Sequence, residues 1–233
     1  VFTDCDIEIE RLISNTFALG ANLLSTKELE YGSIIIDFGF EKTSLGIFKN
    51  FALVHSMTIP IGINHITKDI SKVCSLSLME SESIKDNINF LFQNDQNIVD
   101  LNGYLKQNYF VNSKFRKISK ELILNIIKDR TDEIFKKIKK EINLAKFSIS
   151  AGSNILITGI GSRTMNIEKY LSTFFGLSVK KIENNSEQNK NESIQIFNSC
   201  FGALKIIKDG WETEAIPQSE NKSPEKMGFL LKF

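Results

Sequence analysis

The chain has 233 residues, which is enough for one large domain or two small ones. It carries 29 basic and 28 acidic residues, and this near-balance argues against a protein whose main partner is nucleic acid, because a phosphate backbone demands a basic excess. No apolar run approaches the roughly 18–20 residues that span a bilayer. Cys5, Cys74 and Cys200 are odd in number, lie far apart and match no zinc spacing, which favours a reducing compartment over a disulfide framework.

The start of the chain and its basic residues carry two smaller signals. Val1 stands where a methionine would, and no signal-like segment follows it, so we expect the sequence to be cut from a longer one. Only 4 of the 29 basic residues are Arg, and an Arg in such a sequence is of interest because its fork makes bidentate contacts. The Lys bias by itself is equally typical of an AT-rich genome.

The first third of the chain predicts one or two helices followed by three strands. Residues 7–12 form a short strand or helix, and residues 17–27 form a helix. The runs at 33–38, 44–48 and 52–59 are rich in β-branched residues and are joined by short links, which predicts an antiparallel meander with Asn50 in a tight turn. Pro60 and Gly62 end it.

Helices dominate the middle, and the last third alternates strands and helices. Apolar spacing predicts helices at 63–73 and 81–89, a strand-like stretch at 98–115 with a turn at Asn102-Gly103, and a long helix from Ser119 to about Lys146. Further elements are strands at 154–157 and 177–181 and helices at 166–175 and 194–207, before a polar linker from Lys208. This order predicts a layered α/β domain.

Asp37-Phe38-Gly39 ends a hydrophobic strand. An Asp at a strand end followed by Gly in a tight turn can hold a hydrated Mg²⁺ while backbone N–H groups face phosphate. Thr43 or Ser44 could add a hydroxyl donor. The alternative is a plain hairpin turn.

Thr158-Gly159-Ile160-Gly161-Ser162 links a strand to a helix. Glycines there let the backbone approach a ligand closely, and a helix N-terminus favours anions. The alternative is an ordinary strand-to-helix turn. The segment matches neither the P-loop pattern nor G-x-G-x-x-G.

Glu82 and Lys85 stand three residues apart on a predicted helix. They could grip a ribose hydroxyl and a base edge, although an exposed helical ion pair is far more frequent. His55 and His65 have no Asp or Cys partner at a suggestive spacing and are treated as ordinary residues.

These pieces occur in an order that resembles the second half of the actin/Hsp70/sugar-kinase ATPase superfamily. Within it, the string Pro-x-Gly-x-x-x-Ile-Thr-x-Asp-Ile at 60–70 and the helix Ile-Ser-Lys-Glu-Leu…Ile-Ile…Arg…Glu-Ile-Phe at 118–135 resemble the FtsA family. That family comprises bacterial actin homologues that tether the division polymer FtsZ to the membrane. The resemblance covers most of residues 5–207 and implies an actin-like, ribonuclease H-like α/β ATPase lobe with a small inserted α+β subdomain.

The resemblance implies roles for particular residues. Nucleotide (ATP with Mg²⁺) would be bound by Asp37, Gly39, Thr43, Gly62, Glu82, Lys85, Gly159, Gly161 and Ser162, with Asp37 at the metal. Arg130 would help receive the FtsZ C-terminal tail, whose acidic and apolar character suits an Arg fork beside Ile and Phe. No catalytic residue is assigned, because no general base is evident in this half.

The resemblance also implies a division of the chain. Residues 1–30 would close the preceding actin-like lobe, and residues 31–75 with 118–207 would form the 2A-type subdomain. Residues 76–117 would be the inserted 2B-type subdomain. Residues 208–233 would be a linker and the start of an amphipathic helix whose Met227, Phe229, Leu230, Leu231 and Phe233 enter the membrane interface.

Two features depart from the family pattern. Phe40 and Glu41 replace residues that are usually Gly or Thr, so a side chain and a carboxylate would stand near phosphate oxygens. Ile160 stands where the family often has Gly. Both departures would weaken nucleotide binding.

The function implied is that of an ATP-binding division protein that self-associates and recruits FtsZ to the cytoplasmic side of the bacterial inner membrane, as a peripheral protein at the division site. Three alternatives stay open: a superfamily ATPase or small-molecule kinase, a pilus-assembly ATPase-like protein, and a nucleotide-free scaffold.

Overall fold

The computed structural model describes residues 3–6, 8–9, 12–88, 99–100, 102–111, 116–145, 154–182 and 197–209. The helices are α1 (Asn15–Leu23), α2 (Thr26–Tyr31), α3 (Ile63–Cys74), α4 (Leu78–Asp86), α5 (Lys120–Leu144), α6 (Ile167–Phe175) and α8 (Asn198–Asp209). The strands are β1 (Ser33–Phe38), β2 (Thr43–Lys49), β3 (Ala52–Ile59), β4 (Asn154–Thr158) and β5 (Val179–Lys181). Short 3-10 turns span Thr3–Cys5, Gln107–Tyr109 and Ile160–Arg163.

One mixed sheet organises these elements, with the strand order β3-β2-β1-β4-β5. β1, β2 and β3 pair antiparallel, which confirms the predicted meander, and Asn50 and Phe51 take positive φ in the turn between β2 and β3. β4 pairs parallel with β1 and with β5. β1 is therefore the strand at which the meander and the parallel part of the sheet join.

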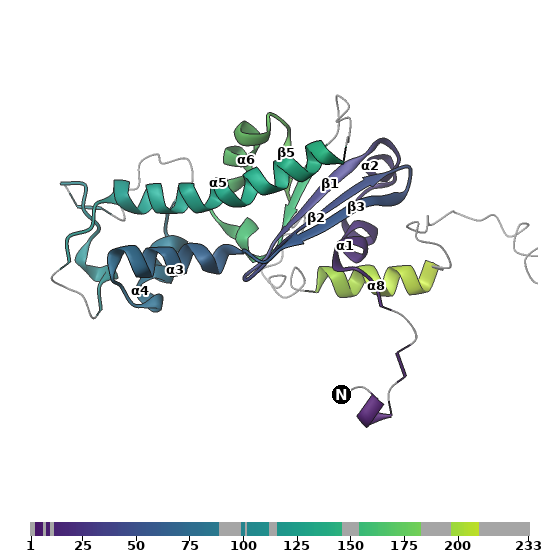
Figure 1. The fold of residues 1–233 in the computed structure, drawn as a ribbon, viewed down its shortest axis with the longest axis horizontal. Coiled ribbons are helices and arrows are strands. Elements are labelled where there is room, and N and C mark those ends of the chain that lie inside the picture. The colour runs from purple at the N-terminus through teal and green to yellow at the C-terminus, as the bar shows by residue number, and fades with distance from the viewer. Residues whose placement is uncertain are drawn as a thin grey trace, which may run out of the picture.

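Helices cover both faces of the sheet, and Figure 1 shows α5 and α6 on one side and α1 and α8 on the other. The alternation along β1 explains this layering, because successive side chains point to opposite faces. Ile34, Ile36 and Phe38 join the larger core with α3 and α5, whereas Ile35 joins the smaller core with α1 and α8. The Phe38 ring meets Phe135 of α5 edge to face, with centroids 5.5 Å apart.

The predicted helix at 17–27 is two helices in the structure. Ser25 accepts a hydrogen bond from the Glu28 N–H, and the Glu28 carboxylate accepts one from the Ser25 N–H, so a capping box starts α2 and breaks the run. A second capping box, formed by Ser77 and Glu80, starts α4. This helix therefore begins at Leu78 and not at the predicted Ser81.

The predicted strand-like stretch at 98–115 contains, among its described residues, only the isolated bridges Val99–Leu105 and Tyr104–Ser119. Gly103 has φ 78°, as a turn at Asn102-Gly103 requires. Of the first predicted element, Glu8, Ile9 and Leu12 are described and belong to no helix or strand.

Residues 12–31 pack on this same sheet, because α1 contacts β1 and β2 and lies against α8. The division of the chain into a preceding lobe, a 2A-type part, a 2B-type insertion and a tail stays a prediction. Along the described stretches, no helix is long and apolar enough to cross a membrane.

The closest approach of α1 and α8 generates a test. A Cβ at Gly202 would overlap the backbone carbonyl of Ala18, so the two helices can meet only with Gly at this position. We expect Gly202→Ala to lower the free energy of unfolding by about 1–3 kcal/mol, the range for overpacking a core. Chemical denaturation measures this loss. Leu204→Ala, on the same helix but 61% exposed, should change stability by no more than about 0.5 kcal/mol. Equal effects would contradict the close approach.

Candidate functional site

The carboxyl ends of β1 and β4 meet at one edge of the sheet, because the two strands are parallel neighbours. Asp37 lies opposite Thr158, the last residue of β4. Gly159 follows with φ 83°, and a Cβ there would overlap the Asp37 carboxylate and the Phe38 carbonyl. The two turns singled out in the sequence therefore lie in direct contact, and Gly159 permits that contact.

A cavity of about 800 Å³ opens at this edge, and we call it the strand-end cavity. Four of the predicted site residues line it: Asp37, Gly39, Gly159 and Ser162. Sequence reasoning missed other residues that line it: Asn15 from α1, Arg163, Lys181, and Asn198 with Ser199 from α8. Nothing local marks these positions, because α1 and α8 reach the cavity only through the tertiary fold.

Asp37 carries the one carboxylate among the described residues that line the cavity. Burial raises its pKa, while a hydrogen bond from Asn15 Nδ2 to Oδ2, at 2.8 Å, and the charge of Lys42 act in the opposite direction. A partly desolvated carboxylate gains from a cation beside it.

The turn after β1 is fastened to the start of α3. The carbonyls of Gly39 and Phe40 accept hydrogen bonds from the N–H groups of Ile63 and Asn64, at 3.0 and 2.9 Å. A Cβ at Gly62 would overlap those same carbonyls. Gly62 therefore serves this junction and does not line the cavity.

Thr43 also holds the junction together, because its hydroxyl donates to the Ile61 carbonyl at 2.7 Å. Its hydroxyl is thus occupied within the protein. A nucleotide contact by Thr43 or Gly62 stays a prediction.

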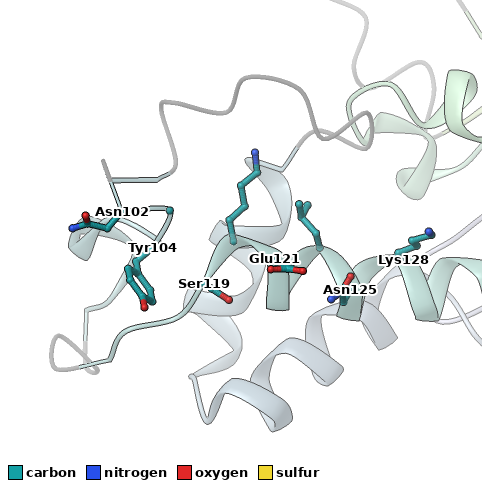
Figure 2. Close-up of a pocket in the computed structure, with 9 residues that line it drawn as sticks. Asn102, Tyr104, Ser119, Glu121, Asn125 and Lys128 are labelled. Atoms are coloured by element: carbon teal, nitrogen blue, oxygen red, sulfur yellow. The ribbon is translucent and has the colours of Figure 1, made fainter.

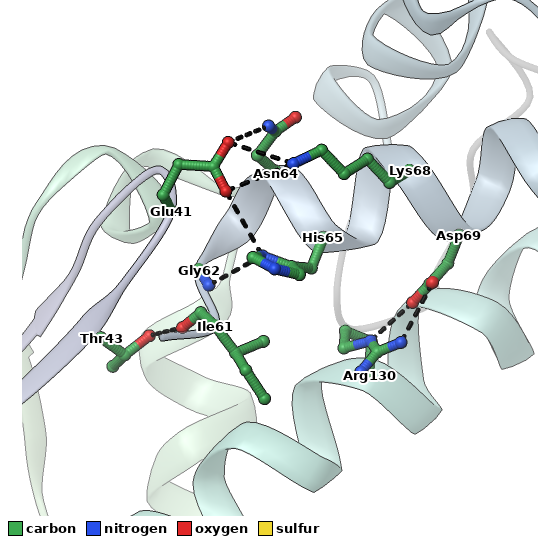
Figure 3. A network of polar contacts seen from close by, with 9 residues as sticks. All are labelled: Glu41, Thr43, Ile61, Gly62, Asn64, His65, Lys68, Asp69 and Arg130. Carbon is green, nitrogen blue, oxygen red and sulfur yellow. Dashed lines mark hydrogen bonds and ion pairs between the residues drawn. The ribbon is translucent and has the colours of Figure 1, made fainter. Parts of the chain in front are cut away.

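Residues of α3 hold the Glu41 carboxylate, and a weakening of phosphate binding by this group stays a prediction. The carboxylate accepts hydrogen bonds from Asn64, at 2.6 Å, and from Lys68, at 3.2 Å, and His65 lies 3.8 Å away (Figure 3). These bonds lower the pKa of Glu41. Glu41 points to α3 and does not line the strand-end cavity, so replacing it with Gly would loosen the turn. Phe40, by contrast, does line the cavity.

Glu82 and Lys85 form an ion pair on α4, but the pair is not the exposed one that the sequence offered as the alternative, because Lys85 is buried. Lys85 Nζ lies 2.8 Å from Glu82, and its side chain is only 6% exposed. The Thr67 hydroxyl donates to the other Glu82 oxygen at 3.1 Å. Neither Glu82 nor Lys85 lines the strand-end cavity, so their contact with ribose or base stays a prediction.

Gly161 lies against the core, whereas Ser162 lies on the side of the strand-end cavity. A Cβ at Gly161 would overlap the Phe38 ring, so a larger residue there would disturb the core instead of entering the space of a ligand, as the sequence had suggested. The Ser162 hydroxyl lies on the cavity side and donates to the Gly159 carbonyl at 2.7 Å, which closes the turn.

Arg130 forms ion pairs both within α5 and across to α3. Its Nε and Nη2 donate to the two carboxylate oxygens of Asp69 on α3, at 2.5 and 3.0 Å, and Nη1 donates to Glu133 (Figure 3). Asp69 is the main cause of the raised Arg130 pKa. The fork therefore joins α3 to α5 in this structure.

A second cavity of about 590 Å³ lies at the start of α5, and we call it the α5 cavity (Figure 2). The turn residues Asn102 and Tyr104 form one side, and Ser119, Asn125 and Lys128 lie along the helix. Leu124 adds an apolar patch. Lys120 and Lys128 contribute positive charge and Glu121 one negative charge, so the lining is mixed, with a basic excess of one.

The predicted membrane-contacting residues Met227, Phe229, Leu230, Leu231 and Phe233 lie outside the described residues. Within the described residues, no group of three or more His, Cys, Asp or Glu could hold a metal by itself.

Comparisons with known proteins place the chain. A family model described as "Cell division protein FtsA" matches residues 34–196. The FtsA of Buchnera aphidicola is 26% identical over 87% of this chain and 49% of its own length, and that of Neisseria meningitidis is 26% identical over 76% and 42%. The chain thus spans about half the length of these relatives.

Solved structures agree on the fold. MreB5 of Spiroplasma citri bound to ADP aligns with a TM-score of 0.63 and 20% identity, covering 89% of this chain and 65% of that one. The PilM–PilN type IV pilus biogenesis complex aligns with a TM-score of 0.58 and 16% identity, covering 89% and 55%. At these identities the likeness shows the fold alone, and it confirms the predicted actin-like α/β architecture. Since the family model matches well over half of the sequence, this chain belongs to the FtsA family of cell division proteins.

Proposed function

We propose that this chain is the half of an actin-like division protein that binds an adenine nucleotide in the strand-end cavity. The observation that carries the proposal is the meeting of Asp37, Gly39, Gly159 and Ser162, from two separate turns, around one cavity. MreB5 of Spiroplasma citri, which shares the fold, was solved with ADP and with AMPPNP. Self-association in the manner of an actin filament belongs to the same proposal, supported by the double helical filament solved for the actin-like MamK.

The residues present fit a nucleotide with Mg²⁺. Mg²⁺ keeps several waters and is held by one or two carboxylates together with substrate phosphates, so a lone buried Asp37 is enough on the protein side. When bound, the ion neutralises phosphate charge. Asn15 holds the Asp37 carboxylate in place, and the φ-positive Gly159 lets the second turn lie directly against it. We assign no catalytic residue.

Asp37 gives the test of this site. We expect Asp37→Asn to remove the Mg²⁺-dependent part of ATP affinity, because the amide keeps the shape and the hydrogen-bonding capacity toward Asn15 but loses the charge. The loss should be about tenfold or more, since even groups that only support metal ligands cost 10–100-fold. Calorimetric titration of the full-length protein with ATP, in Mg²⁺ and in EDTA, measures it.

Asp129→Asn, at an exposed position of α5, is the matched control and should bind ATP as the wild type does. Unchanged Mg²⁺ dependence in Asp37→Asn would remove Asp37 from the metal site. Absence of ATP binding to the wild-type protein would favour the nucleotide-free scaffold, for which Phe40 in the cavity wall is the supporting observation.

We further propose that the N-terminal half of α5 receives the acidic, apolar C-terminal tail of FtsZ. Lys128 and the apolar Leu124 line the α5 cavity, and Arg130 lies half a turn beyond on the same helix. Arg130 is committed to Asp69, so it contributes in one of two ways: it contacts the tail, or it fixes α3 against α5.

Peptide binding separates these two roles. Lys128→Glu should weaken binding of an FtsZ tail peptide about tenfold at low salt and less at high salt, because exposed charges are screened. Arg130→Glu should abolish it. If Arg130 contacts the tail, Asp69→Asn should bind the peptide as tightly as the wild type or more tightly, because the Arg130 guanidinium is then released from Asp69. Fluorescence anisotropy on the full-length protein measures all three, with circular dichroism as the check on folding. Wild-type affinity in both Lys128→Glu and Arg130→Glu would refute the α5 surface.

Attachment to the cytoplasmic face of the inner membrane completes the proposed role. Its support is the cluster of apolar residues with Lys226 and Lys232 at the end of the sequence, a composition that suits an amphipathic helix lying in the interface. The protein would thereby link the FtsZ ring to the membrane at the division site.

A further inference from the structure

Asn198, the first residue of α8, is a buried polar residue with an unused donor. It is 7% exposed, and its Oδ1 accepts a hydrogen bond from Asn22 Nδ2 of α1 at 3.1 Å. Its own Nδ2 is buried and has no hydrogen-bond partner. Because the bond from Asn22 fixes which end of the amide is the oxygen, the free group is an N–H donor, and only an acceptor can satisfy it.

The position of Asn198 distinguishes it from the other unsatisfied groups of the described residues. Among these, Ser33 Oγ and Thr131 Oγ1 also lack a hydrogen-bond partner, and neither residue lines either of the two cavities described above. Asn198 forms part of the wall of the strand-end cavity, together with its neighbour Ser199. A buried donor left unpaired is costly, and at a cavity wall a ligand acceptor is the natural way to compensate it.

The course of α1 tells which end of a nucleotide reaches this donor. Asn15 of α1 holds Asp37, which marks the phosphate end of the cavity, and Leu19 lines the cavity one turn further on. Asn22, which holds Asn198, is seven residues beyond Asn15, or about 10 Å along the helix axis. A ligand whose phosphates lie at Asp37 and whose long axis follows α1 would bring its nucleoside to Asn198.

We propose that Asn198 is a nucleoside-contacting residue of the strand-end cavity, donating its Nδ2–H to an acceptor on the ribose or the base. This inference rests on the proposed nucleotide site. The proposed site then includes α8, the last described helix, in addition to the two turns that the sequence had singled out. The Asn22–Asn198 bond orients the donor.

The experiment measures the affinity of the full-length protein for ADP and for ATP by calorimetry. Asn198→Asp keeps the oxygen that accepts from Asn22 and removes the donor, and Asn198→Ala removes both. We expect each variant to bind ADP and ATP equally more weakly than the wild type, by about three- to tenfold for Asn198→Ala, the value of one hydrogen bond.

Two controls accompany these variants. Asn22→Ala removes the bond to Asn198 but leaves its donor, and Asn125→Asp adds the same charge at the α5 cavity. Asn125→Asp should bind nucleotide within about twofold of the wild type, less than the value of one hydrogen bond. Asn22→Ala should lose less affinity than Asn198→Ala, because the donor is no longer oriented but is still present.

Three results would overturn the proposal. The first is wild-type affinity in Asn198→Asp and Asn198→Ala. The second is a loss in Asn22→Ala as large as that in Asn198→Ala, which would reveal a purely structural role. The third is a loss confined to ATP, which would place the acceptor on the terminal phosphate. Failure of the wild-type protein to bind ADP or ATP would instead refute the proposed nucleotide site, and this inference with it.

Discussion

The parallel pairing of β1 with β4 is the constraint on which the rest of the structure depends. It brings two turns that are about half the chain apart in sequence to one edge of the sheet, with Asp37 opposite Thr158. The turns then touch so closely that Gly159 lies against the Asp37 carboxylate and Gly161 against the Phe38 ring. Phe38 in turn meets Phe135 of α5. The cavity and the core are therefore parts of one packing arrangement, and a change in either turn is felt on both sides of the sheet.

The helix α3 connects the turn after β1, at this edge of the sheet, to the long helix α5. Its first N–H groups are capped by the carbonyls of Gly39 and Phe40, and Asn64 and Lys68 of its first turns hold Glu41. One residue further on, Asp69 binds the fork of Arg130 on α5. The exposed pairs of this network contribute little one by one, but they share side chains, which lowers the entropy cost of each additional bond. The turn at the strand-end cavity and the surface of α5 are thus fixed to the same helix.

Much of this architecture follows from local sequence. The meander, the long helix α5 and the strand before Gly159 are specified by β-branched runs, apolar periodicity and glycine positions. Sequence reasoning misplaced the start of α4 and merged α1 with α2, because it overlooked the Ser-x-x-Glu capping boxes at Ser25 and Ser77. It could not find the intramolecular partners of Glu41 and Arg130, because Lys68 and Asp69 are brought near them only by tertiary packing. Sequence reasoning missed Asn15 and Asn198 as cavity residues for the same reason.

The strand-end cavity is also where the described part of the fold leaves polar groups least compensated. A buried amide donor without a partner costs about 1–3 kcal/mol, and the raised pKa of Asp37 shows that its charged form is disfavoured by burial despite the bond from Asn15. Both groups are held in place by α1, through Asn15 and through Asn22. The two amides of α1 therefore orient one desolvated carboxylate and one unpaired donor but do not satisfy either group fully. These polar groups reach their lowest free energy only when a ligand supplies the missing cation and the missing acceptor.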